Sequence, residues 1–393
     1  MSTAFARLGS ISASEARAKA EGRAARLGLA AKLLRLDWGM VLLVGAIATI
    51  GFLMLYSVAG GDADPWASRQ LVRFLVGVAL MLIIALVDIR LWRFASPFAY
   101  AAALGLLVAV EFVGTTGMGA TRWIQLGPMQ LQPSELMKIG LVMALARYYD
   151  WLGEGKVSHP LWMIPPIVLI LVPMALVLKQ PDLGTAMLIG LGGAVVMFLA
   201  GVSLWYFAAV AAMGGATVWA VFASRGTEWQ ILKNYQYRRI DTFLDPDVDQ
   251  LGAGYHITQS KIAMGSGGLE GRGFMQGTQS RLNFLPEKHT DFIFTTLSEE
   301  FGFIGAITLL ALYLTVAMLC IFSMLRNADR YGALLTGGLA AAFFFFWAVN
   351  IAMVTGLVPV VGVPLPLVSY GGSAMLVLMI AFGLIQCAHV HRR

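Results

Sequence analysis

Apolar runs of membrane length recur along most of the chain, separated by polar segments. A helix needs about 20 apolar residues to cross the hydrocarbon core of a bilayer. The fourth run is the weakest, and we expect it to form a short or tilted span. The pattern predicts an all-α integral membrane protein with about ten transmembrane helices. These are Trp38–Val58, Leu71–Val87, Trp92–Val113, Leu136–Tyr149, Leu161–Leu178, Leu183–Ala200, Leu204–Ala223, Phe301–Met324, Tyr331–Val354 and Leu367–Cys387.

One long hydrophilic segment interrupts the pattern, at about residues 224–290 between the seventh and eighth spans. Within it, the stretch that starts at Gly254 is typical of a short amphipathic helix, stopped by the glycines at 265–268. We therefore expect two regions: a polar arm at residues 1–37 and a polytopic membrane domain at residues 38–393 that carries one large loop.

Composition agrees with this class. Hydrophobic residues make up 58% of the 393 residues and charged residues only 13%, whereas soluble proteins carry about 25% charged residues. The two cysteines, Cys320 and Cys387, lie far apart in apolar runs. They fit neither a disulfide framework nor a metal-ligand spacing, so we expect both to pack in the core.

The net charge of +6 is concentrated in the N-terminal arm. A basic arm would suit nucleic acid, but beside a membrane domain it is more typical of a cytoplasmic anchor against anionic lipid. We therefore expect no nucleic-acid partner. With the arm inside, the positive-inside rule places both termini in the cytoplasm and the long loop outside. The short basic loops that agree hold Arg90 and Arg93, Arg147 and Lys156, Arg326 and Arg330, and the tail 391–393.

This topology brings every polar cluster near the apolar runs to one outer face. The clusters are Thr121–Lys138, Lys179–Thr185, the loop that ends at Asp291, and Gly356–Ser373. A channel or transporter would need polar groups through its full depth. The one-sided distribution favours a site that faces the membrane surface.

Asp291 is the strongest candidate for chemistry, because it ends the hydrophilic loop just before an apolar helix. Thr290 or Asp291 would also suit a helix N-cap. A carboxylate partly desolvated at the lipid boundary has a raised pKa, which suits a general base. Glu287 and His289 are further candidates for the same site.

A second set of polar residues surrounds the start of the fourth and sixth helices. Ser134 is predicted to cap the fourth helix, with Glu135 and Lys138 on one face. The pair would be either a structural ion pair or a holder of an anionic phosphate. Asp182 is expected to cap the sixth helix with Thr185. We also include Trp123, otherwise an interfacial aromatic, and Lys179 as an extra cation.

Prolines and glycines fill the segment from Gly356 to Ser373 at membrane depth. Such backbone is tolerated only where it is buried in protein or lines a cavity. Ser369 and Tyr370 would then offer hydroxyl groups to that cavity, unless the loop is purely structural.

The ordered motifs are similar to those of a known family. QPSELMK (132–138), QPDLGTA (180–186), GAGYHITQSKIAMGSGG (252–268), FLPEKHTDFIF (284–294) and the final SYGGS (369–373) resemble the signature of the SEDS family (shape, elongation, division and sporulation). The resemblance runs from about Trp38 to the C-terminus and is nearer to the rod-shape branch than to the division branch.

The resemblance implies a peptidoglycan glycosyltransferase of the bacterial inner membrane. Its substrate would be lipid II, a disaccharide-pentapeptide on undecaprenyl pyrophosphate, and its partner a class B penicillin-binding protein. Asp291 matches the family's presumed catalytic aspartate, and Trp123, Glu135, Lys138 and Lys261 fall in its motifs.

We expect Asp291 to act as the base of an inverting transfer that extends a glycan strand. The charge of the leaving pyrophosphate would fall to Lys138, Arg239 and a divalent cation, Mg²⁺ or Mn²⁺, carried by the pyrophosphate because no carboxylate cluster predicts a fixed metal site. Two alternatives stay open: a transporter that flips lipid II, and a non-catalytic scaffold for a transpeptidase.

Overall fold

The computed structural model describes residues 28–117, 120–127, 129–234, 237, 240, 241, 244, 253–282, 284 and 287–392. Most of the basic arm, together with Arg239, lies outside the described residues.

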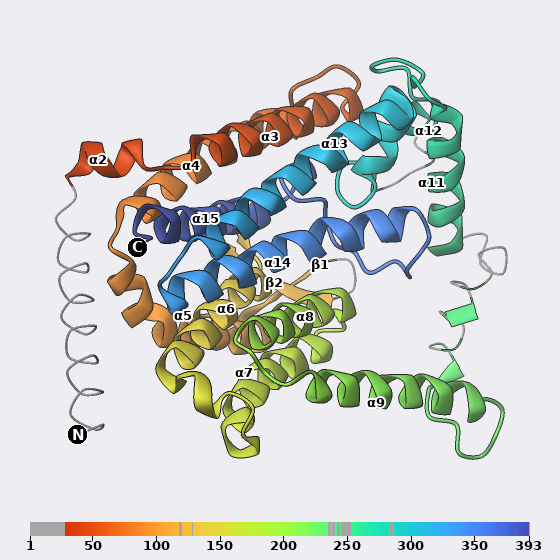
Figure 1. The fold of residues 1–393 in the computed structure, drawn as a ribbon. Coiled ribbons are helices and arrows are strands. Elements are labelled where there is room, and N and C mark those ends of the chain that lie inside the picture. The colour runs from red at the N-terminus through yellow and green to blue at the C-terminus, as the bar shows by residue number, and fades with distance from the viewer. Residues whose placement is uncertain are drawn as a thin grey trace, which may run out of the picture.

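Long helices form most of the molecule (Figure 1). By length and composition, eight of the described helices could cross a membrane. These are α3 (Trp38–Val58), α4 (Ala67–Leu86), α5 (Ile89–Val113), α7 (Pro160–Lys179), α9 (Leu204–Ala223), α13 (Ile293–Leu325), α14 (Arg330–Val354) and α15 (Gly372–Val390).

The other two expected spans are also helices, but of a different character. The helix α8 (Leu183–Leu199) is apolar and short, and α6 (Pro133–Leu152) is largely buried against α5, α14 and α8. Because α6 carries Glu135 and Lys138 among its buried residues, protein rather than lipid must surround it. The prediction that Ser134 caps α6 is wrong, because Gln132 occupies the cap position and Pro133 begins the helix.

The eighth expected span, Phe301–Met324, is preceded by a short helical segment that the hydrophobic pattern did not indicate. The helix α13 starts at Ile293 rather than at Phe301, and it is kinked at Gly302, where φ is +64° and ψ is −161°. At the kink, the amide groups of Phe303 and Ile304 donate to the carbonyls of Gly268 and Leu269. The kink therefore joins α13 to the end of α11 (Ala253–Gly267), the helix expected inside the long loop.

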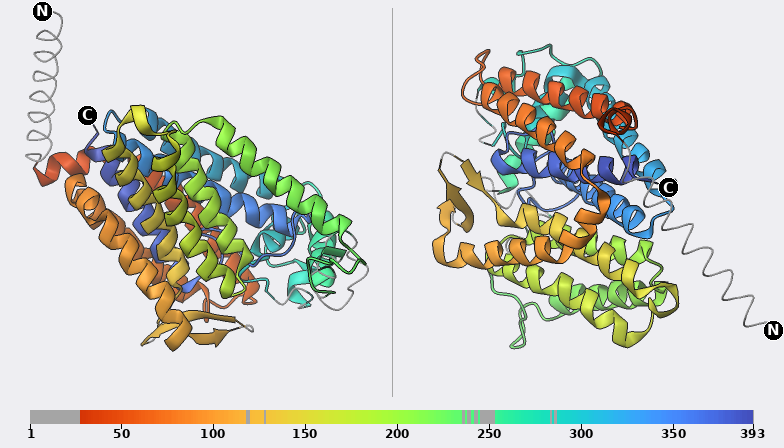
Figure 2. Two further views of the ribbon diagram at one scale, coloured as in Figure 1. Left: turned by 90° about the horizontal axis from the view of Figure 1, so that it is seen from below. Right: turned by 90° about the vertical axis from the view of Figure 1, so that its left-hand side faces the viewer.

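The polar segments contain further short elements. A three-stranded antiparallel sheet, not foreseen in the all-α expectation, comprises β1 (Thr115–Gly117), β2 (Ala120–Leu126) and β3 (Met129–Leu131). It lies between α5 and α6 and projects from one end of the bundle (Figure 2). Among the elements that the structure describes, the remaining short helices are α2 (Leu29–Leu34), α12 (Thr278–Arg281) and the 3₁₀ turn Glu154–Lys156.

Burial is uneven across the bundle. The helix α15 packs against α4 and is the most buried candidate span, whereas α9 has no buried residue and extends away from the other helices (Figure 1). The two free cysteines, Cys320 and Cys387, are buried as expected. In the segment that leads into α15, residues 365–369 are buried in protein, whereas Leu357 near its start is 74% exposed.

Candidate functional site at one end of the bundle

Asp291 lies in a tight turn at residues 287–292, directly before α13. The amides of Thr290 and Phe292 both donate to the carbonyl of Glu287 at 3.2 Å, and the Thr290 hydroxyl donates to the Glu287 carboxylate at 2.8 Å. Phe292 is the cap residue of α13, and no side chain caps it. The helix-capping alternative for Thr290 and Asp291 is therefore wrong, and the Asp291 carboxylate is left for another role.

The irregular segment between α14 and α15 holds this turn in place. Asn350 is fully buried in α14, and its side-chain amide donates to the carbonyl of Asp291 at 2.9 Å and to that of Val363 at 2.6 Å. Gly362 has φ of +66° and lies next to the Asp291 carboxylate: a Cβ atom added to this glycine would lie 3.5 Å from Oδ2 of Asp291. A glycine supports this left-handed conformation without strain, and it leaves space beside the carboxylate.

Ser369 and Tyr370 complete the connection on the other side of the turn. The Ser369 hydroxyl donates to the carbonyl of Thr290 at 2.6 Å and accepts from the amide of Leu365 at 2.7 Å. The amide of Tyr370 donates to the carbonyl of His289 at 2.9 Å. Both residues therefore lie at the site and hold the Asp291 turn by its backbone carbonyls, Ser369 through its hydroxyl and Tyr370 through its amide.

The environment of Asp291 favours a proton acceptor. Burial, with smaller effects of the neighbouring Glu287 and Asp182 charges, raises the pKa of Asp291 to about 6. Burial also lowers the pKa of His289, whose ring stacks on Trp66 with centroids 4.6 Å apart. Asp291 is therefore ionised in most molecules at neutral pH but still binds a proton readily, while His289 is neutral.

Asp182 belongs to the same cluster of polar residues. It caps α8 as expected, accepting from the amide of Thr185 at 3.1 Å and from its hydroxyl at 3.0 Å. Arg122 of β2 lies 3.5 Å from its carboxylate. The start of α8 also touches the loop beside Asp291, because a Cβ on Gly184 would lie 2.8 Å from the carbonyl of Val361.

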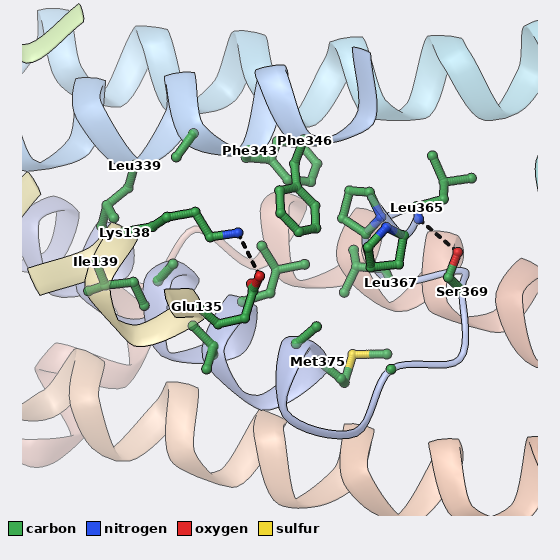
Figure 3. Close-up of a pocket in the computed structure, with 18 of the residues that line it drawn as sticks. Glu135, Lys138, Ile139, Leu339, Phe343, Phe346, Leu365, Leu367, Ser369 and Met375 are labelled. Atoms are coloured by element: carbon green, nitrogen blue, oxygen red, sulfur yellow. Dashed lines mark hydrogen bonds and ion pairs between the residues drawn. The ribbon is translucent and has the colours of Figure 1, made fainter. Parts of the chain in front are cut away.

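Glu135 and Lys138 form the expected ion pair, with 2.8 Å between Nζ and Oε1. Both are buried, and the ammonium lies 3.8 Å from the centre of the Phe346 ring. The pair forms one wall of a cavity of ≈ 60 Å³ that also includes Gln70, residues 364–367 and Ser369. Figure 3 shows Glu135 and Lys138 facing the aromatic side chains of α14 across this space. Ser369 therefore lies between the ion pair and the Asp291 turn.

The other expected site residues are placed less centrally. Lys179 pairs with Glu111 at 2.9 Å and is largely exposed. Trp123 lies in β2, partly buried, next to Arg122. Lys261 of α11 reaches Gly356, where a Cβ would lie 2.8 Å from its Nζ. These residues surround the outer part of the site, whereas Asp291, Asp182 and the Glu135–Lys138 pair lie deeper.

Three residues of α4 and its start join the site without having been predicted. Gln70 is almost fully buried and donates to the carbonyl of Ser369 at 2.9 Å. The Arg73 guanidinium lies 4.8 Å from the centre of the Tyr370 ring, and Trp66 stacks on His289. The sequence did hold one signal for this group: Arg73 interrupts an apolar run, and a charged residue inside a membrane helix indicates a functional position.

No group of three metal-ligating side chains occurs in the part of the chain that the structure describes. The described side chains at the site include one carboxylate with a raised pKa, a buried ion pair and exposed cations. Together with the helical bundle, these features define a multi-pass membrane protein with a cluster of polar and ionisable side chains at one end of its spans.

Comparison with known proteins identifies the family. Residues 37–393 match the model of the FtsW/RodA/SpoVE family of cell cycle proteins, and the chain belongs to this family. It is 42% identical to the peptidoglycan glycosyltransferase MrdB of Escherichia coli K12, over 91% of this chain and 94% of that one. It is 33% identical to the peptidoglycan glycosyltransferase RodA of Treponema pallidum, over 89% of this chain and 96% of that one.

Solved structures support the same family assignment. The RodA structure of Thermus thermophilus superposes with a TM-score of 0.66 at 30% identity, covering 91% of this chain and 97% of that one. A chain from a structure described as a peptidoglycan synthase complex that coordinates polymerization and crosslinking superposes with a TM-score of 0.77 at 32% identity, covering 90% and 97%. The expected fold class and family are confirmed.

Proposed function

We propose that this protein is a peptidoglycan glycosyltransferase that polymerises lipid II into glycan strands during cell elongation. Its relatives carry the name of that enzyme class. The observation that carries the proposal is the position of Asp291, a partly buried carboxylate with a pKa of about 6 beside the open Cα face of Gly362.

Asp291 acts as the general base. It takes the proton from the C4 hydroxyl of the acceptor's N-acetylglucosamine while that oxygen forms a bond to C1 of the donor sugar. The bond from C1 to the pyrophosphate oxygen breaks on the opposite side, so the sugar is inverted to a β-1,4 linkage. A carboxylate whose pKa lies near the working pH suits this task. The hydrogen bonds from Asn350 and Ser369 fix the turn and so orient the base.

The leaving undecaprenyl pyrophosphate gains negative charge as the bond breaks, and nearby cations stabilise that charge. Lys138 is the buried candidate, already held in place by Glu135. Lys261 and Arg239, which belong to the long hydrophilic segment of the sequence, are further candidates. The described residues provide no metal cluster, so a divalent cation, Mg²⁺ or Mn²⁺, would arrive with the pyrophosphate.

The site faces the periplasm, and both termini face the cytoplasm. The short loops and adjoining helix ends at the opposite end of the bundle hold Arg90, Arg93, Arg326 and Arg330. The positive-inside rule applies to short loops, so it supports this orientation although the long loop is also basic. A class B penicillin-binding protein is the partner, because a related chain occurs in a peptidoglycan synthase complex that couples polymerization to crosslinking.

The test is polymerisation of labelled lipid II by the purified protein and by Asp291→Ala, each with and without a penicillin-binding partner. We expect no polymer from Asp291→Ala at unchanged partner binding. Normal polymerisation by the variant would exclude Asp291 as the base. Lipid II transport into vesicles by a wild type that forms no polymer would identify a transporter, and retained partner binding without either activity would identify a scaffold.

A further inference from the structure

A pair of adjoining pockets lies at the end of the bundle opposite to Asp291. Three segments meet there: the residues between α2 and α3, the end of α13 and the end of α15. In Figure 1 this is the end where α2 and the C-terminus lie, whereas α11 and α12 lie at the other end. The catalytic proposal uses none of these residues.

The larger pocket has a volume of ≈ 810 Å³ and is strongly basic. Arg35, Arg326 and Arg392 line it, and each comes from a different segment. Among the described residues, none of the three forms an ion pair. Asp37 is the one acidic residue in the lining, and its carboxylate accepts from the amide of Met40 at the start of α3. In the described part of the chain, the lining therefore holds three arginines against one aspartate, an excess of positive charge.

The smaller pocket, of ≈ 220 Å³, continues from the larger one along α13. The two share Asp37, Arg326, His389 and Arg392, and the smaller one adds the apolar side chains of Leu319 and Phe322. His389 is held by a hydrogen bond of 2.9 Å to Ser323. A basic pocket thus leads directly to an apolar groove on the side of a membrane-spanning helix.

Aromatic and apolar side chains on this surface match the boundary of a bilayer. Trp38 is 47% exposed and Phe322 is 54% exposed, and the Trp38 indole donates to the carbonyl of Leu33. Tryptophan with a satisfied polar edge is typical of the level of lipid head groups. Free phosphate would use the arginines alone, whereas an anionic phospholipid would use the arginines and the groove together.

We propose that these pockets bind the phosphate head group of an anionic phospholipid. The phosphate lies among Arg35, Arg326 and Arg392, and an acyl chain begins along Leu319 and Phe322. Because the three arginines belong to three segments, the bound lipid links the start of α3 to the ends of α13 and α15. The site takes a structural lipid and not the substrate, which the first proposal places at the other end.

Native mass spectrometry of the full-length protein in detergent tests the site, with phosphatidylglycerol, phosphatidylcholine with the same acyl chains, and inorganic phosphate as probes. We expect phosphatidylglycerol to bind in preference to phosphatidylcholine. The double variant Arg326→Gln/Arg392→Gln should raise the half-saturating phosphatidylglycerol concentration by roughly tenfold or more, since each basic residue near an anionic lipid surface strengthens attraction by about fivefold.

The matched control is Arg225→Gln/Arg281→Gln, which removes the same charge from other surfaces. It should leave the half-saturating concentration within about twofold of the wild type. A second variant, Phe322→Ser, tests the groove and should weaken lipid binding without affecting phosphate.

Equal binding of both lipids, or equal effects of the two double variants, would overturn the proposal. Competition by inorganic phosphate at the same concentration as phosphatidylglycerol would also overturn it, because the groove would then contribute nothing.

Discussion

The hydroxyl of Ser369 donates to the carbonyl of Thr290 at 2.6 Å, and so binds the residue next to Asp291. Ser369 and Thr290 lie 79 residues apart along the chain. The same hydroxyl accepts from the amide of Leu365, which fixes the irregular loop before α15. One side chain thus connects the Asp291 turn to the loop that lines the cavity beside Glu135 and Lys138.

Replacing Ser369 with alanine should reduce both stability and activity. The change leaves the Leu365 amide and the Thr290 carbonyl without this partner in a buried place, and an unsatisfied buried polar group costs about 1–3 kcal/mol. We expect a lower melting temperature in detergent and slower lipid II polymerisation, because the Asp291 turn loses a fixed contact.

Ser298→Ala is the matched control for that experiment. Ser298 is also buried, but its hydroxyl donates only to Phe294 in its own helix. The control should change the melting temperature less than Ser369→Ala and should leave polymerisation near the wild-type rate. Equal effects of the two variants would show that Ser369 has no special link to the site.

The pH dependence of kcat/KM should have an acid limb with a midpoint at about 6, the pKa of Asp291. The base must be ionised to accept a proton, so activity rises as the pH increases through this value. Glu287→Gln removes a negative charge that raises the pKa of Asp291, and should move the limb to lower pH. Glu111→Gln, at a carboxylate paired with Lys179, should not move it. An unchanged limb in Glu287→Gln would contradict the assignment.

Stability should respond to pH in the opposite direction. The pKa of Asp291 is raised from 3.8 to about 6 in the folded protein, so the folded state binds the proton more tightly than the unfolded state. Stability contributed by this residue is therefore present at low pH and is lost as the pH rises from about 4 to about 6. Each pKa unit corresponds to about 1.4 kcal/mol, so the ionised side chain costs about 3 kcal/mol at neutral pH.

Asp291→Asn should remove that cost. Its melting temperature should exceed that of the wild type at pH 7.5 and approach it at pH 4, measured in the same detergent. A melting temperature below that of the wild type at pH 7.5 would show that the carboxylate stabilises the fold.

The sequence predicted the ten helices, because hydrophobic length is a strong local signal. It also predicted the Glu135–Lys138 pair and the Asp182 cap, because both depend on spacing within one helix. It failed on local details, such as the caps predicted at Ser134 and at Thr290 or Asp291, and it did not foresee contacts between distant segments. The early start of α13 was missed because Glu299 and Glu300, both buried in the structure, interrupt the apolar pattern.

The residues that contact the Asp291 turn also could not be predicted from the sequence. Asn350 and Ser369 reach the turn through hydrogen bonds to backbone carbonyl groups, and such contacts leave no spacing rule in the sequence. Gln70 and Arg73 meet the site only because α4 packs against α15. The roles of individual site residues, Arg239 among them, stay predictions.

The Glu135–Lys138 pair allows structural and catalytic roles to be separated. Lys138→Met leaves the buried Glu135 carboxylate without its cation, and breaking such a pair costs about 3–5 kcal/mol. We therefore expect a large fall in melting temperature for this single variant. The double variant Glu135→Gln/Lys138→Met removes both charges. It should recover most of the lost stability, because replacing both members of a buried ion pair by uncharged residues often leaves stability unchanged.

The polymerisation rate of this stable double variant tests the catalytic role. If Lys138 stabilises the leaving pyrophosphate, the double variant should still polymerise lipid II at least about 100-fold more slowly than the wild type, the scale of losing one transition-state contact. Recovery of wild-type polymerisation together with stability would show that the pair only supports the fold.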